Sequence, residues 1–135
     1  MVQGRLGFNV DNGRYGLLVT DLWENDGYKN RRRVAMVKHI ILWQLKDELS
    51  AEEKMVIKAE MKESLEGLVG KVPGLLEVRV QIKGLASSNA EVMLDTTLTD
   101  EAALKGYAVH PEHVAVADSK VRPFTKTRMC LDFEV

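Results

Sequence analysis

Several residue types are scarce in this chain of 135 residues, and each scarcity excludes a class of protein. A single cysteine, Cys130, rules out an internal disulfide and a zinc site built from several cysteines. Basic and acidic residues balance, 19 against 20, which argues against a general nucleic-acid binder. No apolar run approaches the roughly 18 residues of a membrane span, and no secretory signal is recognisable. We therefore expect a cytoplasmic protein that binds neither nucleic acid nor membrane.

Common catalytic motifs are also missing. The sequence contains no glycine-rich phosphate loop, no G-x-S-x-G and no H-E-x-x-H, which excludes a nucleotide-driven enzyme or a serine hydrolase. Its three histidines come from different predicted elements, and no carboxylate has a diagnostic spacing to them. We therefore expect neither an organic cofactor nor a metal.

The chain divides into an N-terminal extension, residues 1–35, and a domain, residues 36–135. The extension holds half of the ten glycines. Residues 5–10 and 15–22 predict two short strands, and Asp11-Asn12-Gly13 between them is typical of a hairpin turn. A polar linker follows over residues 24–33.

The basic run Arg31-Arg32-Arg33 has three interpretations. It is a solvated linker, or it contacts phosphate or RNA, although it lacks the interleaved aromatics of such sites. In the third interpretation, Arg32-Arg33 is a translated ribosome-binding sequence, Met36 is the native start and residues 1–35 are upstream sequence.

The domain reads as strand, helix, strand, strand, helix, strand. Ser50 and Glu53 form a capping box at the start of the first helix, and Pro111 fits the first turn of a later helical segment. This order predicts an α+β, ferredoxin-like βαββαβ fold, an antiparallel sheet with helices on one face. The expected strands are 37–45, 75–82, 91–98 and 126–135, and the expected helices run from 51 to about 69, from 101 to about 109, and onward from 111.

Helices on one face leave the other face of the sheet open. We expect His39, Trp43 and their strand neighbours to form an apolar patch on that open face. Two such sheets facing each other would close a dimeric α/β barrel, so a two-fold homodimer is expected. The alternative is that the N-terminal hairpin covers this face in a monomer.

Three segments of the domain together resemble a known family. They are the opening MVKHIILWQLKD, the motif Tyr107-Ala-Val-His110-Pro111-Glu112-His113, and the closing RPFTKTRMCLDFEV. Residues 36–135 resemble the stress-responsive dimeric α/β-barrel (Dabb) domain. The resemblance implies a homodimer of ferredoxin-like subunits around a small cavity, and many members of that family have no assigned activity.

Plant polyketide cyclases, and more distantly cofactor-independent antibiotic-type monooxygenases, resemble this family. The resemblance implies that His113 is a general base, which removes a proton next to a carbonyl. It also implies that Tyr107 donates a hydrogen bond to the oxygen on which charge develops. In the alternative interpretation, the motif fixes the turn between two helical segments and Tyr107 is a core aromatic residue.

Five further residues are candidates for ligand binding. They are His39, Ile41, Trp43, Met93 and His110. His39 is either a contact for a polar ligand or a satisfied interior histidine, Trp43 and Met93 are suited to filling the barrel, and the side chain of His110 can cap a helix. Cys130 is expected to be a packed thiol.

Two functional hypotheses follow. The first is a dimeric barrel that binds a small apolar or aromatic molecule without chemistry. The second is an enzyme without organic cofactor, either an aldol-type cyclase or a monooxygenase whose substrate reacts with oxygen directly. The enzyme requires a cavity on which His113 and Tyr107 converge.

Overall fold

The computed structural model describes residues 35–135. The predicted hairpin, the polar linker and the basic run at 31–33 lie outside the described residues, and so does the proposal that the hairpin covers the sheet. No helix in the described part of the chain is long and apolar enough to cross a membrane.

The secondary structure follows the predicted order closely. The strands agree with prediction to within one residue at each end, and the third helical segment begins at Pro111 as expected. The elements are β2 (Val37–Leu45), α2 (Ala51–Glu66), β3 (Leu75–Gln81), β4 (Val92–Leu98), α3 (Glu101–Val109), α4 (Pro111–Val116), the π-helical turn η2 (Ala117–Val121), the 3-10 turn η3 (Arg122–Phe124) and β5 (Thr125–Glu134).

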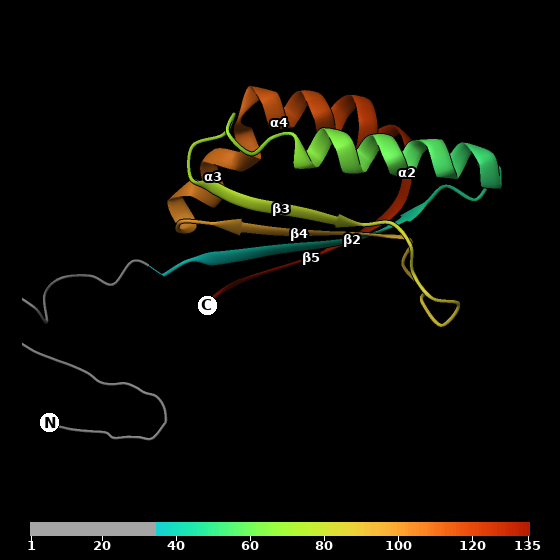
Figure 1. The fold of residues 1–135 in the computed structure, drawn as a ribbon, viewed down its shortest axis with the longest axis horizontal. Helices are drawn as coiled ribbons and strands as arrows, with labels where there is room; N and C mark the ends of the chain where they lie inside the picture. The colour runs from blue at the N-terminus through green and yellow to red at the C-terminus, as the bar shows by residue number, and fades with distance from the viewer. Residues whose placement is uncertain (1–34) are drawn as a thin grey trace, which may run out of the picture. The chain divides into compact units, whose positions relative to one another are not determined.

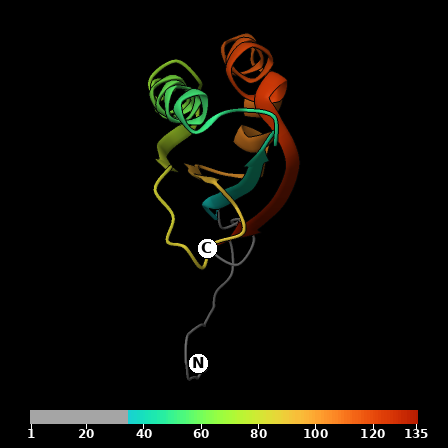
Figure 2. The same cartoon turned by 90° about the vertical axis from the view of Figure 1, so that its right-hand side faces the viewer.

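The four strands form one sheet in the order β3-β4-β2-β5, and each neighbouring pair is antiparallel. All the helices lie on the same side of this sheet (Figures 1 and 2). The arrangement confirms the predicted ferredoxin-like fold, with β2 and β4 central and β3 and β5 at the edges.

Helix α2 begins at the predicted capping box. The Ser50 hydroxyl accepts a hydrogen bond from the Glu53 amide, and the Glu53 carboxylate accepts one from the Ser50 amide. The helix ends at Glu66, three residues earlier than expected, with Gly67 as its C-cap, and the turn that follows passes through Gly70 and Gly74. Both glycines have positive φ, 92° and 80°, a conformation that favours glycine. The helix contributes Ile57, Met61 and Leu65 to the core.

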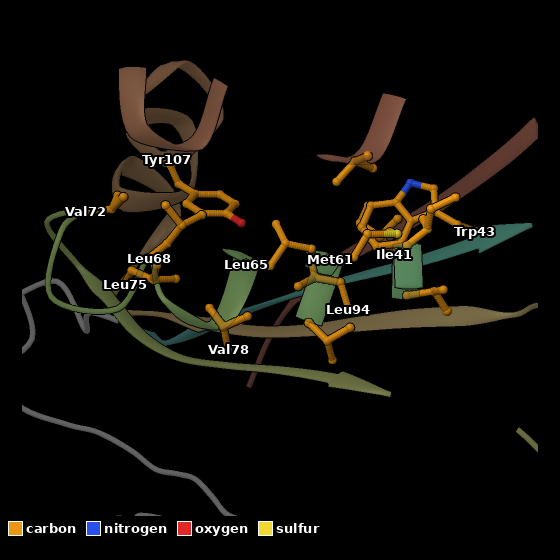
Figure 3. Close-up of a cluster of buried hydrophobic side chains, with 14 of the residues drawn as sticks. Ile41, Trp43, Met61, Leu65, Leu68, Val72, Leu75, Val78, Leu94 and Tyr107 are labelled. Atoms are coloured by element: carbon orange, nitrogen blue, oxygen red, sulfur yellow. The ribbon is translucent and has the colours of Figure 1, made fainter. Parts of the chain in front are cut away.

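The core lies between the helices and the face of β2 that carries His39, Ile41 and Trp43. Figure 3 shows Ile41 and Trp43 on the same side of the sheet as Met61, Leu65 and Tyr107. The expectation that His39 and Trp43 lie on the open face is therefore wrong. Both faces of β2 are apolar, so alternation alone could not identify the covered one. The helices cover the larger apolar side chains, and Trp43 is only 5% exposed.

The open sheet face is formed instead by the other set of alternating side chains. Met129 on β5 lies opposite Leu42, and Leu131 lies opposite Ile40. Met129 and Leu131 are 72% and 64% exposed. We use "open sheet face" for the apolar surface made by Ile40, Leu42, Met93, Met129, Leu131 and Phe133.

Candidate functional site

A cavity of about 120 Å³ lies between the sheet and the helical segments α3, α4 and η2. It is similar in size to an engineered cavity of about 150 Å³ that binds benzene. Its apolar lining comes from the sheet, α2, α3 and η2, and includes Ile41, Trp43, Leu65, Leu94, Leu104 and Val121. Its polar lining includes His39, Tyr107, His113, Arg122 and Arg128.

Tyr107 and His113 lie next to each other in the lining of the cavity. Helix α3 carries Tyr107 and α4 carries His113, and Pro111 begins α4 between them. Their rings are 4.2 Å apart between centroids and tilted by 34°. Tyr107 extends from its helix into the interior above the sheet (Figure 3). Within residues 35–135, neither its hydroxyl oxygen nor His113 Nδ1 has a hydrogen-bond partner, although both atoms are buried.

Burial shifts the pKa of both groups. It raises the pKa of Tyr107 to about 12, so the phenol stays protonated and can donate a hydrogen bond at neutral pH. Burial also lowers the pKa of His113, although the nearby backbone of Ala108 acts in the opposite direction. Neutral His113 offers a lone pair, so the pair combines one donor and one acceptor.

His39 enters the same cavity from the sheet. Its ring meets that of Tyr107 edge to face, with centroids 5.9 Å apart. The imidazole is 8% exposed, and its Nδ1 lies 2.5 Å from Asp132 Oδ1. An ionised carboxylate only accepts hydrogen bonds, so Nδ1 carries a proton and donates to Asp132.

The structure brings together five of the seven predicted site residues. His39, Ile41, Trp43, Tyr107 and His113 all line the cavity. The other two do not. Met93 lies opposite Leu42 on the open sheet face, because it alternates with the buried Val92 and Leu94. His110 caps α4, where its Nδ1 accepts a hydrogen bond from the Glu112 amide.

Three polar residues near the cavity were not predicted. Asp132 orients His39, and Arg122 and Arg128 line the cavity. Arg128 lies opposite Trp43, so its side chain shares the face of the sheet that carries the cavity. Strand register could have identified Asp132 and Arg128, but register between strands about ninety residues apart is not visible in the sequence. Cys130 is exposed, so the expectation of a packed thiol is wrong.

This geometry places the protein in the class of ferredoxin-like α+β domains with a cavity between helices and sheet. The stress responsive A/B barrel domain family, Dabb, matches residues 37–135. The chain belongs to this family, as its motifs indicated. A comparison with curated proteins finds no match.

Solved structures with the same fold come from bacteria and plants. A dimeric, ferredoxin-like protein of unknown function from Bacteroides fragilis is 33% identical, with a TM-score of 0.69. The match covers 74% of this chain and 96% of that one. A dimeric ferredoxin-like protein of unknown function from Thermobifida fusca is 21% identical, with a TM-score of 0.64, and the match covers 76% and 93% of the two chains.

An enzyme is among the structures of similar fold. Hydroxynitrile lyase from Passiflora edulis is 14% identical, with a TM-score of 0.62, and the match covers 76% of this chain and 95% of the enzyme. At this identity the similarity establishes the fold alone, because one fold supports many functions.

Proposed function

We propose that this protein is a homodimer that binds a small aromatic molecule carrying a carbonyl oxygen. The observation that supports the proposal is the pair of buried polar atoms in residues that line a largely apolar cavity. Within the described chain, Tyr107 Oη and His113 Nδ1 have no partner. Leaving a buried polar group without a hydrogen bond costs about 1–3 kcal/mol. A ligand that supplies the missing partners recovers part of that free energy.

The cavity favours one ring over a larger ligand. Its volume of about 120 Å³ is close to that of the cavity that takes benzene, and its walls are largely aliphatic and aromatic. The Tyr107 hydroxyl is suited to donate to a carbonyl oxygen, because the tyrosine stays protonated. Apolar walls with a few convergent polar groups are typical of small-molecule sites.

Binding can be tested with two probes, benzaldehyde and benzene, titrated into the protein and followed by NMR. We expect benzaldehyde to bind more tightly than benzene. Tyr107→Phe should weaken benzaldehyde binding about two- to tenfold, the effect of losing one net hydrogen bond. Benzene should bind the variant and the unchanged protein equally. His110→Asn is the matched control, since asparagine also caps a helix and residue 110 lies outside the cavity lining. Equal benzaldehyde affinity in the Tyr107→Phe variant, or no binding of either probe, contradicts the proposal.

The homodimer rests on the open sheet face. Met129, Leu131 and Phe133 expose 72%, 64% and 41% of their surface on one edge strand. Contiguous apolar surface of this kind marks interaction sites in soluble proteins. A second copy placed by a two-fold axis would cover it, and the relatives from Bacteroides fragilis and Thermobifida fusca are described as dimeric.

Two methionines of equal exposure make a matched test of the dimer. Met129 on the open sheet face and Met55 on α2 are each 72% exposed. Light scattering at micromolar concentration should give a dimeric mass for the unchanged protein and for Met55→Lys. Met129→Lys should give a monomer, because a charge would be buried between the sheets. A monomeric unchanged protein, or a dimeric Met129→Lys variant, contradicts the proposed interface.

A second candidate function is catalysis without a cofactor. The observation that favours it is the lowered pKa of His113 beside a protonated Tyr107. Neutral His113 Nδ1 would take a proton from the carbon next to the carbonyl, and Tyr107 would stabilise the enolate oxygen. Aldol-type cyclisation and reaction of the substrate with oxygen both begin with such a carbanion.

The first step of that chemistry is measurable without the natural substrate. In D₂O, phenylacetaldehyde should exchange its α-hydrogens for deuterium faster with the protein than without it. His113→Ala should reduce the protein's contribution about 10²-fold or more, the usual range for a general base. Exchange that is equal with and without the protein, or unchanged in His113→Ala, rules out His113 as the base.

A further inference from the structure

Three different metal-binding atoms converge beside the cavity, at the edge of the sheet. They are His39 Nδ1 on β2 and Cys130 Sγ and Asp132 Oδ1 on β5, and all lie within 4.8 Å of one another. Strand register explains the convergence. Asp132 is directly opposite His39, and Cys130 is two residues earlier, so the three side chains share one face of the sheet.

The arrangement differs from that of a catalytic triad. In a triad, the carboxylate and the nucleophile contact opposite nitrogens of the imidazole. Here Asp132 Oδ1 lies 2.5 Å from Nδ1, and Cys130 Sγ lies 3.9 Å from the same nitrogen. The histidine therefore cannot carry a proton between the other two groups. Nδ1, Sγ and Oδ1 instead surround one point, as the ligand atoms of a metal ion do.

The distances are close to those of a tetrahedral zinc site. With Zn–S of about 2.3 Å and Zn–N and Zn–O of about 2.0 Å, sulfur lies about 3.5 Å from the other ligands, and N and O lie about 3.3 Å apart. The Cys130 Sγ to Asp132 Oδ1 distance is 3.4 Å, and the Sγ to Nδ1 distance is 3.9 Å. The contact between His39 and Asp132 must widen by about 0.8 Å, and the Sγ to Nδ1 distance must shorten by about 0.4 Å. The side chain of Asp132 is 41% exposed and has room to rotate.

We propose that His39, Cys130 and Asp132 bind one Zn²⁺ ion, with the fourth coordination position open. Thiolate, imidazole and carboxylate are the ligands that zinc takes in proteins, and three ligands with an open position are typical of sites that bind water or substrate. Cys130 and Asp132 reach solvent, which provides an entry path. The site goes beyond the ligand-binding function proposed above, because it uses Nδ1 of His39 and none of the atoms of Tyr107 or His113.

Without metal, the thiol is held in its protonated form. Burial and the neighbouring Asp132 carboxylate raise the pKa of Cys130, and Arg128 on the same strand acts in the opposite direction. Zinc would therefore release a proton from the thiol on binding, and His39 would bind the ion through Nδ1 as a neutral imidazole with its proton on Nε2. Arg128 favours the thiolate but repels the cation, so the affinity depends on how far its guanidinium turns toward the cavity.

Cobalt(II) is a direct spectroscopic probe for this site. Reduced, metal-free protein titrated with Co²⁺ should bind one equivalent and develop a near-ultraviolet charge-transfer band, which requires a thiolate ligand. Added Zn²⁺ should abolish the band by displacement. Cys130→Ser should lack the band, and Asp132→Asn should bind Co²⁺ more than about tenfold more weakly, since even outer-shell partners contribute about 10–100-fold to affinity.

Asp47→Asn is the matched control, because Asp47 is an exposed aspartate that pairs with Lys126 away from the cluster. It should bind Co²⁺ as the unchanged protein does. Circular dichroism of each variant confirms that it folds. A titration with no charge-transfer band, or a Cys130→Ser variant that retains the affinity, overturns the proposal. Neither result affects the benzaldehyde test, so the two proposals fail separately.

Discussion

His39 and Asp132 face each other across two neighbouring strands, with Nδ1 and Oδ1 2.5 Å apart, although 93 residues separate them in the sequence. The contact fixes the tautomer and the ring orientation of a buried histidine. It also connects two features of the molecule, the cavity beneath the helices and the donor cluster at the sheet edge, by which we mean the metal-binding atoms of His39, Cys130 and Asp132.

The turn after α2 should accept no side chain at residue 74. Gly74 has φ of 80°, and a Cβ there would lie 2.5 Å from the Cβ of Ala103. Strain and overpacking together should lower the free energy of unfolding by about 2–4 kcal/mol in Gly74→Ala. Urea unfolding measures this value.

Gly106 is the matched control for that substitution. It is an exposed residue within α3, and a Cβ there would meet nothing within 4 Å. Gly106→Ala should raise the free energy of unfolding by about 0.5–1 kcal/mol. A Gly74→Ala variant as stable as Gly106→Ala would show that the turn is not built as described.

Stability should fall as the pH drops through the histidine range. Burial lowers the pKa of His113 from its ordinary value of 6.5, so the unfolded chain binds the proton first. The contribution of His113 to the free energy of unfolding should be constant above about pH 7.5, where His113 is neutral in both states, and should decrease below pH 6.5 until the folded pKa is passed. His113→Gln removes this contribution. Plots of the free energy of unfolding against pH for the unchanged protein and for His113→Gln should therefore differ in slope below pH 6.5. Parallel plots would contradict the lowered pKa of His113.

Removing the Tyr107 hydroxyl should cost little stability. That oxygen has no hydrogen-bond partner in residues 35–135, so Tyr107→Phe breaks no such bond there. The unfolding free energy should stay within about 1 kcal/mol of the unchanged protein or increase, because a buried polar atom is lost. Ser50→Ala is the contrasting control, because the Ser50 hydroxyl accepts a hydrogen bond from the Glu53 amide. Loss of this cap should lower the free energy of unfolding by about 1 kcal/mol. A large loss of stability in Tyr107→Phe would reveal a partner for the hydroxyl.

His110 should matter for stability and not for ligand binding. Its Nδ1 caps the Glu112 amide at the start of α4. His110→Ala should lower the free energy of unfolding by about 0.5–1 kcal/mol and leave benzaldehyde affinity unchanged. Affinity measured at a temperature where the variant is fully folded separates the two effects. Weaker benzaldehyde binding by the folded His110→Ala variant would show that His110 contributes to the ligand site.

Most of the fold could be predicted because its signals are local. Alternation in β2, the capping box at Ser50 and Pro111 at the start of α4 each depend on residues a few positions apart. The order of these elements then restricts the topology. The covered face of the sheet could not be predicted in this way. Ile41 and Ile40 are equally apolar, and only packing against α2 and α3 separates them.

The candidate site could be predicted in part for the same reason. Tyr107 and His113 belong to one short motif, and the structure places both in one cavity. Asp132 and Arg128 are brought to the cavity by the pairing of β5 with β2, and the local sequence pattern does not reveal that pairing. His110 shows the opposite case. The sequence offered His110 as a ligand contact or as a helix cap, and its side chain caps the helix that begins at Pro111.

The pairing of β2 with β5 has a consequence for how the molecule folds. Strands β3 and β4 are joined by a short loop and pair early at low entropic cost, whereas β5 must close a loop of about eighty residues to reach β2. An intermediate that lacks this last strand pair would already contain α2, β3 and β4 and bury Met61 and Leu65. It would hold Tyr107 near the sheet without Asp132 to orient His39. Kinetically, the donor cluster should therefore be the last part of the domain to form and the first to open.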